Sequence, residues 1–288
     1  MLGLRKKKAA ASVPCEAPAP AVLDARGNEL LRLPEPGAAM LPSSLAFSLY
    51  KAGSTLLSKV LEDLAPHAGV RAYNLEKELF RLGIEHRDLP KSVAGVFRER
   101  GYCYTVFRSM PFAYEIPIFE NAPKLLLVRD PRDILVSHYF SMGKTHPTPG
   151  DAVSQKKRER FDRERQIVQT TTVDEHALRK AELFRRYFAE YDRRLLAQPN
   201  LRIDRYEDIV FSKPDWVDAI CGHLGWEIEV ETRASVAQKH DIVPEDEQGN
   251  RHIRRVRPGD HVEKLRPETI ASLNETFAPV LERYGYDR

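Results

Sequence analysis

A lysine, a glycine and two hydroxyl residues stand where an apolar run ends. They are Lys51, Gly53, Ser54 and Thr55, and the apolar spacing that follows predicts a helix over 54–64. Unpaired N–H groups and the dipole at the start of a helix attract anions, so this turn could bind a phosphate. The alternative is an ordinary glycine turn with Ser54 as the helix N-cap. The Walker A pattern GxxxxGK[ST] is absent.

An arginine at the end of another apolar run is followed eight residues later by a serine. Arg129 comes directly after the run at 124–128, and Ser137 lies inside the helix expected next, with Asp130 as its N-cap. An arginine at the carboxyl end of a buried strand points into the crevice where open parallel sheets bind ligands. It can hold a phosphate with two parallel hydrogen bonds. The alternative is that Arg129 pairs with Asp130 or Asp133.

The elements that would position these residues alternate along the chain. Expected strands are 45–50, 70–73, 102–107, 124–128 and 201–206, and expected helices are 54–64, 131 onward, 174–196, 214–224 and 267–284. Such alternation predicts an α/β fold with a central parallel sheet and helices on both faces.

Three segments depart from the alternating pattern. Residues 1–38 are rich in Ala and Pro and are expected to be a flexible arm, which leaves one domain at 39–288. The alternative from Val22 onward is packing onto the domain, because Leu23, Leu30, Leu31 and Leu33 appear there. The polar segments 143–172 and 238–261 are long for a compact domain, and such loops often cover a site. The alternative for both is a solvated surface excursion.

Composition excludes several classes of protein. The 45 basic and 42 acidic residues leave a net charge of only +3, which argues against a nucleic-acid-binding protein. The three cysteines are widely spaced without a CxxC pair, which argues against a disulfide framework or a zinc site and indicates a reduced, cytoplasmic protein. No apolar run approaches the roughly 20 residues that span a bilayer. No cluster has metal-ligand spacing, so no metal is expected.

Taken together, the two phosphate-binding patterns resemble the PAPS-dependent sulfotransferase family, whose donor is 3′-phosphoadenosine-5′-phosphosulfate (PAPS). Residues 50–56 resemble the family's 5′-phosphosulfate loop, in which the lysine touches the bridging oxygen and the 5′-phosphate. Arg129 and Ser137 resemble its 3′-phosphate motif. The cofactor contacts that these two motifs imply are Lys51, Gly53, Ser54, Thr55, Leu56, Arg129 and Ser137.

Two later segments extend the resemblance. The run 206–208 (Tyr-Glu-Asp) is similar to the family's segment whose tyrosine, here Tyr206, lies near the adenine. The run 254–260 is similar to the loop that closes over the 3′-phosphate, which implies roles for Arg254, Arg255 and Gly259. The departures from the family's pattern are Ala52 for Ser or Thr, Leu56 for Trp, Val256 for Gly and His261 for Trp.

The general base is where this chain departs most from the family. The small-molecule branch has a histidine in a Lys-Thr-His-x-Pro run, but Ser109 occupies that position here. The carbohydrate-modifying branch uses a glutamate shortly after the second strand, and Glu76 is the preferred match. His146 and Glu115 are the reserve candidates.

The resemblance implies transfer of a sulfuryl group from PAPS to a hydroxyl acceptor by in-line displacement. The acceptor would be a glycan, a lipid or a small molecule, and the oligomeric state stays open. The segment 143–172 would line the acceptor side, and 238–261 would cover the nucleotide. The alternatives are a P-loop-like nucleotide kinase or hydrolase, and a non-catalytic relative that binds nucleotide.

Overall fold

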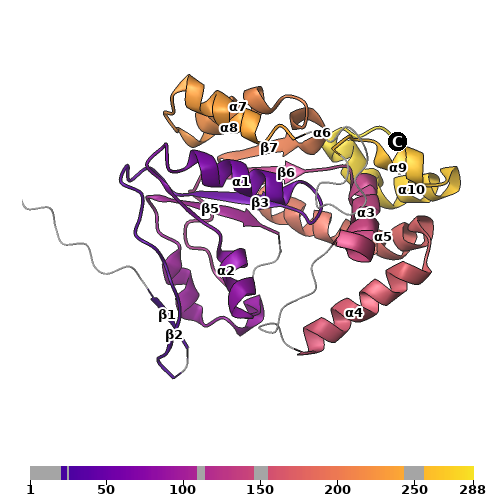
Figure 1. Cartoon of the computed structure of the whole chain (residues 1–288), viewed down its shortest axis with the longest axis horizontal. Helices are drawn as coiled ribbons and strands as arrows, with labels where there is room; N and C mark the ends of the chain where they lie inside the picture. Colours follow the sequence, from indigo (N-terminus) through magenta and orange to yellow (C-terminus); the bar gives the residue numbers. More distant parts are fainter. Residues whose placement is uncertain (1–20, 25, 109–113, 146–154, 243–255) are drawn as a thin grey trace, which may run out of the picture.

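Five parallel strands form the central sheet of the computed structural model, which describes residues 21–24, 26–108, 114–145, 155–242 and 256–288 (Figure 1). Their order is β4-β5-β3-β6-β7, and every neighbouring pair is parallel. The strands are β3 Ser44–Ser48, β4 Arg71–Tyr73, β5 Tyr102–Phe107, β6 Lys124–Val128 and β7 Leu201–Arg205. The parallel α/β sheet expected from the alternating pattern is therefore confirmed.

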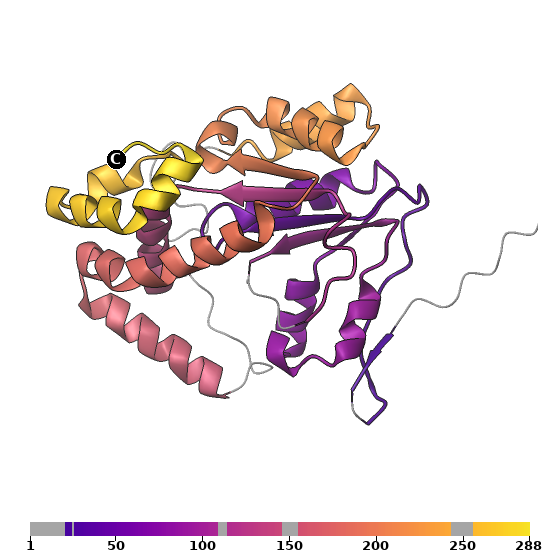
Figure 2. The ribbon, with the colours of Figure 1, turned by 180° about the vertical axis from the view of Figure 1, so that it is seen from behind.

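Helices cover both faces of this sheet (Figures 1 and 2). One face packs against α1 Ser54–Leu64, α7 Lys213–Leu224 and α8 Val230–Lys239. The other packs against α2 Leu75–Leu82, α3 Pro131–Phe140, α5 Val173–Leu195 and α10 Pro267–Tyr284. Since both faces are covered, β3, β5 and β6 are buried along their whole length. This is why these strands read as continuous apolar runs in the sequence.

Local capping chemistry sets the start of two helices beside the sheet. The Asp130 side chain accepts a hydrogen bond from the backbone N–H of Arg132, so it caps α3 as expected. Thr172 and Glu175 form a reciprocal capping box at the start of α5. The α3 helix ends in a π-helical turn, Ser141–Thr145.

The folded part of the chain begins before the expected boundary at residue 39. Strands β1 Ala21–Leu23 and β2 Glu29–Arg32 form an antiparallel pair in which Val22 lies opposite Leu31. Both of these side chains are buried in the main core, as is Leu33. The short apolar run therefore belongs to the domain, while residues 1–20 lie outside the described part.

The two long polar segments are partly helical. Residues 155–170 form α4 (Gln155–Thr170), whose Glu164 pairs with Arg179 at 2.6 Å and Lys180 at 2.8 Å on α5. Ion pairs thus attach this helix, which has few apolar residues to bury. The segment 238–261 is helical at both ends, in α8 and in α9 Asp260–Lys264, and 243–255 lie outside the described residues. Within the described ranges, none of the helices combines the length and apolarity that crossing a membrane requires.

Candidate active site

Two of the predicted motifs meet where the central strands end. Strands β3 and β6 are neighbours, and the chain leaves them toward opposite edges of the sheet, to β4 and to β7. A crevice opens at the carboxyl ends of such a strand pair. Lys51 follows β3 and Arg129 follows β6, and Nη1 of Arg129 lies 3.4 Å from the carbonyl oxygen of Lys51. The sheet topology therefore joins two segments that are far apart in the sequence.

The turn after β3 has an unusual backbone. Lys51 has φ 67°, in the left-handed region that residues other than glycine rarely adopt. Gly53 has φ 98°, and a Cβ atom added there would lie 2.9 Å from Cδ2 of Tyr206 and 3.0 Å from Cδ2 of Leu127. Both the backbone angle and the close contacts therefore require glycine at position 53.

This turn leads into α1 without a capping side chain. Gly53 is the N-cap, so Ser54 as N-cap is wrong, and glycine has no side chain that could cap the helix. The first helical hydrogen bond runs from Leu57 N to Gly53 O at 3.1 Å. The preceding N–H groups have no carbonyl partner within the helix, which leaves a partly positive end. Ser54 and Leu56 are half-buried and Thr55 is exposed at this end.

Arg129 is a buried cation at the crevice, with 6% of its surface exposed. Its Nη2 lies 3.5 Å from Oδ2 of Asp133, so the alternative of an Arg–Asp pair is also realised, at a long distance. Its Cζ lies 4.6 Å from the centre of the Tyr206 ring. Its Nε is buried and has no hydrogen-bond partner among the described residues. Such a donor costs about 1–3 kcal/mol, which an oxygen of a bound anion would relieve.

The segment before α9 docks against the start of α3 through Asp133. This carboxylate is fully buried and accepts hydrogen bonds from Gly259 N at 2.8 Å, His261 N at 2.9 Å and His261 Nδ1 at 2.7 Å. Burial by itself would raise the pKa of Asp133, but the hydrogen bond from His261 and the charge of Arg129 outweigh it and hold the pKa at about 2. His261 thus has a structural role in place of the family's tryptophan.

Tyr206 connects these parts. Its ring lies against Gly53 and under the Arg129 guanidinium, and its hydroxyl donates to the carbonyl of Val256 at 3.4 Å. The Val256 side chain is buried in the core beneath α1 and α7, which accounts for an apolar residue where the family's pattern has glycine. Gly53, Arg129, Tyr206 and the segment before Gly259, all predicted from sequence, therefore form one contiguous site.

Glu207, which was not among the residues predicted from sequence, holds the backbone turn after Arg129. Its Oε1 accepts from Asp130 N at 2.9 Å and its Oε2 accepts from the Tyr286 hydroxyl at 3.0 Å. Burial raises its pKa. Its position next to Tyr206 in the Tyr-Glu-Asp run was the only available signal.

The candidate bases differ in their burial and in their hydrogen-bond partners. Glu76 lies at the start of α2, just after β4, with 6% of its surface exposed. Its Oε1 accepts from Arg108 N at 2.7 Å and its Oε2 from Arg108 Nε at 3.0 Å, at the carboxyl end of β5. Glu115 is exposed. The positions outside the described residues are Ser109, His146, Arg254 and Arg255.

Ser137 is half-buried on α3, two turns beyond Arg129.

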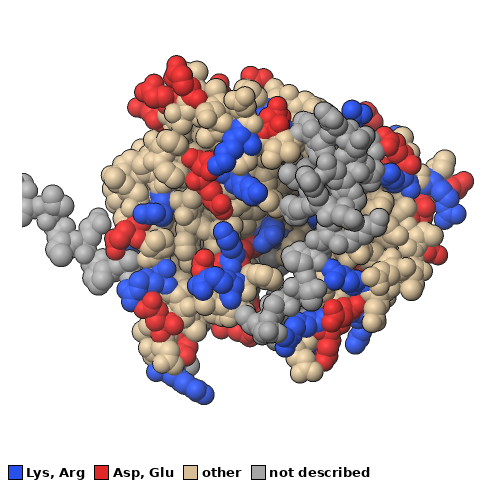
Figure 3. Space-filling view, in the orientation of Figure 1, with Lys and Arg blue, Asp and Glu red and all other residues tan. Residues whose placement is uncertain are grey.

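The space-filling view shows Lys and Arg side chains gathered around a hollow near the centre of the molecule's front face (Figure 3). A positive crevice of this kind suits an anionic ligand.

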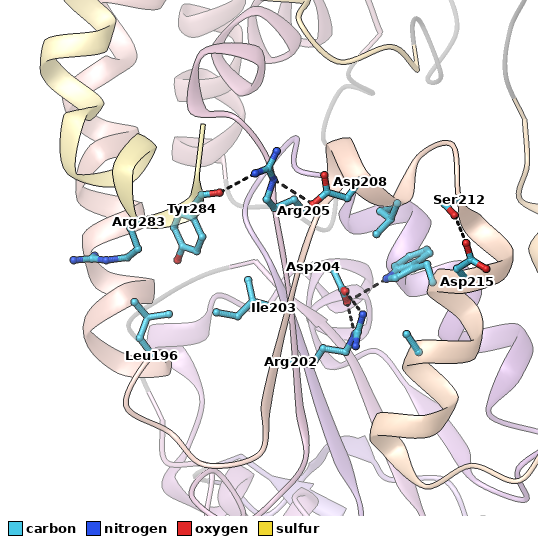
Figure 4. A pocket seen from close by; sticks show the side chains of 13 residues that line it. Leu196, Arg202, Ile203, Asp204, Arg205, Asp208, Ser212, Asp215, Arg283 and Tyr284 are labelled. Atoms are coloured by element: carbon cyan, nitrogen blue, oxygen red, sulfur yellow. Dashed lines mark hydrogen bonds and ion pairs between the residues drawn. The ribbon is translucent and has the colours of Figure 1, made fainter. Parts of the chain in front are cut away.

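A surface cavity of about 730 Å³ lies elsewhere, along the outer edge of β7 (Figure 4). Two pairs of its polar side chains bond within the lining: Arg202 with Asp204 at 2.7 Å, and Ser212 with Asp215 at 2.5 Å. Its lining does not include Lys51, Arg129 or Tyr206, so the cavity is not part of the site built on the strand ends.

The chain resembles solved structures in fold. It matches mouse sulfotransferase SULT7A1, solved in complex with PAP, with 14% identity, 84% of each chain covered and a TM-score of 0.57. It also matches retinol dehydratase in complex with androsterone and inactive cofactor PAP, with 16% identity over 83% of this chain and 80% of that chain and a TM-score of 0.45. A sulfotransferase domain from the Synechococcus PCC 7002 olefin synthase matches with 14% identity, 85% and 98% coverage and a TM-score of 0.34. No family model and no curated protein matches the sequence. The likeness to the mouse enzyme shows that the two chains share a fold.

Proposed function

We propose that this protein is a sulfotransferase that moves a sulfuryl group from PAPS to a hydroxyl acceptor. The observation that carries the proposal is the buried Arg129, whose Nε lacks a hydrogen-bond partner among the described residues, beside the uncapped start of α1. The shared fold with a PAP-bound mouse sulfotransferase supports it.

Each residue of the site has a part in the proposed reaction. Arg129 and Ser137 would bind the 3′-phosphate, and the first-turn N–H groups of α1 with Gly53, Ser54, Thr55 and Leu56 would bind the 5′-phosphate. Lys51 would neutralise charge on the bridging oxygen as the S–O bond breaks. The bond to the acceptor oxygen forms on the opposite side of sulfur, and the acceptor proton goes to the base. Catalysis would then consist mostly of positioning and charge stabilisation.

The covering segment would complete the nucleotide site. Its described end is held beside Arg129 through Asp133 and Gly259, which supports a role for the preceding Arg254 and Arg255 in binding the 3′-phosphate. We expect the enzyme to work in the cytoplasm, without a metal ion. The helix α4, attached to α5 by Glu164, would border the acceptor side.

Nucleotide preference tests the proposal. Adenosine-3′,5′-bisphosphate (PAP) should bind at least 10-fold more tightly than AMP or ATP in isothermal titration calorimetry, because a second phosphate meets Arg129. Incubation with PAPS and glycan, lipid and phenol acceptors should give a product of increased mass, equal to one sulfuryl group, by mass spectrometry. Tighter binding of ATP, with phosphate transfer or hydrolysis, would favour a kinase or hydrolase instead. PAP binding without any product would favour a non-catalytic relative.

Glu76→Gln tests the proposed base. Turnover should fall by at least ~10²-fold, and the acid limb of the pH–rate profile should disappear. PAP affinity should stay nearly constant, since Glu76 pairs with Arg108 at the end of β5 and the carboxylate would face the acceptor. The control is Glu78→Gln on the same helix, which should keep full activity. If Glu76→Gln retains turnover while His146→Ala abolishes it, the base is His146.

A further inference from the structure

Two histidines contact each other beside the proposed active site. His138 follows Ser137 on α3, and His176 lies on α5. Nδ1 of His138 lies 3.0 Å from Nε2 of His176, and the rings stack with their centres 5.2 Å apart. The Phe184 ring meets His138 edge-on at 5.5 Å. Neither histidine has a role in the reaction described so far.

The hydrogen bonds of this pair have a direction. Nη2 of Arg179 lies 3.2 Å from Nδ1 of His176. A guanidinium can only donate, so Nδ1 of His176 must accept, and a neutral ring then carries its proton on Nε2. That Nε2–H donates to Nδ1 of His138. By the same reasoning, neutral His138 carries its proton on Nε2.

Both rings are neutral at neutral pH. Burial lowers the pKa of His138 to about 3, and the charges of His176, Lys180 and Lys51 act in the same direction. Burial also lowers the pKa of His176 to about 4. Among the described residues, the carboxylate of Glu164 opposes these shifts without reversing them. The tautomers derived above therefore apply at the pH at which the enzyme would work.

The chain of hydrogen bonds links α4 to His138, the neighbour of Ser137 on α3. It begins at Glu164 on α4, which accepts from Arg179 Nη2 at 2.6 Å and Nη1 at 3.2 Å. His176 in the middle is fully buried, and His138 at the end is half-buried. Lys51 is near enough to this end for its charge to act on His138. The last group of the chain is thus the Nε2–H of His138, which directly follows Ser137 of the proposed 3′-phosphate motif on α3.

We propose that His138 donates its Nε2–H to a phosphate or sulfuryl oxygen of an anion bound at Lys51. The identity of that anion as PAPS rests on the proposed function. The only unprotonated nitrogen of His138 is occupied by His176, so His138 is a hydrogen-bond donor and not the general base. His176, Arg179 and Glu164 are positioning residues that set its tautomer.

Nitrogen NMR of the full chain labelled in histidine tests the tautomer directly. At neutral pH the His138 spectrum should show a protonated Nε2 and an unprotonated Nδ1, with no titration between about pH 5 and 8. The Nε2–H signal should shift when inorganic sulfate, and separately PAPS, is added. An unprotonated Nε2, or an unchanged signal at sulfate and PAPS concentrations that saturate Lys51, would overturn the inference. Neither result depends on the preference for PAP over AMP that tests the proposed function.

Two pairs of variants separate donation from packing. His138→Gln keeps an N–H near the position of Nε2, and His138→Phe keeps only the ring. We expect His138→Phe to lower kcat by about 10-fold or more, which is the effect of losing one charge-assisted hydrogen bond. His138→Gln should recover most of that loss. Arg179→Met should allow the chain to reverse, so that His138 shows a mixture of tautomers, whereas Arg186→Met on the exposed face of α5 should not. Equal activity of the two His138 variants, or unchanged tautomers in Arg179→Met, would contradict the proposal.

Discussion

Replacing Arg129 with methionine should weaken PAP binding by about 10- to 150-fold and leave AMP binding almost unchanged. The range corresponds to about 1.5–3 kcal/mol for hydrogen bonds from a charged group. Methionine keeps an apolar stem, so the change removes mainly the guanidinium that lies over the Tyr206 ring and faces Lys51 and Asp133. Calorimetric titration of each nucleotide measures the effect.

A matched variant controls for altered charge. Arg202→Met removes an arginine from β7 that pairs with Asp204, away from the crevice. It should leave both nucleotide affinities unchanged. A loss of PAP and AMP affinity by the same factor in Arg129→Met would mean that Arg129 supports the turn at Lys51 and does not read the 3′-phosphate.

Replacing Lys51 with methionine should lower turnover by about 10²–10³-fold, the usual effect of removing one group that stabilises charge in a transition state. Lys51 follows β3 and has φ 67°, a strained backbone angle. Methionine is also a linear side chain, so the strain energy at this position should stay the same in the variant. PAP affinity should fall by a smaller factor, because the charge on the bridging oxygen grows only as the sulfuryl group leaves. Steady-state rates with the acceptor found in the product screen give the comparison.

Lys59→Met on the exposed surface of α1 is the control for Lys51→Met, and it should behave as the parent protein. A drop in PAP affinity as large as the drop in turnover would indicate uniform binding and no special role in the transition state. Turnover within about threefold of the parent would remove Lys51 from the mechanism.

Local pattern predicted the central strands well because β3, β5 and β6 are buried on both faces. The runs at 102–107 and 124–128 coincide with β5 and β6, and the helix at 54–64 coincides with α1. The strand pair at 21–32 was not predicted, although packing from Val22 onward was the alternative to a flexible arm, because only a few apolar residues such as Val22 and Leu31 anchor it. Helix α4 was missed because ion pairs to α5, and not an apolar stripe, attach it.

By itself, the sequence determined which residue types could bind phosphate and at which strand ends they lie. Lys51, Gly53, Arg129 and Tyr206 were all identifiable, because turn chemistry and strand ends are local properties. Tertiary structure decided what these residues touch. Asp133 receives hydrogen bonds from Gly259 and His261, which are 126 and 128 residues away in the sequence.

The same holds for the two groups whose roles are least visible in the sequence. Glu76 looked like a base after the second strand, and the neighbouring β5 strand supplies Arg108 to both of its carboxylate oxygens. No role for His138 was predicted from the sequence. Its contact with His176, and through it with Arg179, exists only because α5 packs against α3. Such contacts depend on strand order and helix packing, which local periodicity does not specify. Protonation and hydrogen-bond direction, and with them the chemistry of the site, follow from those long-range contacts.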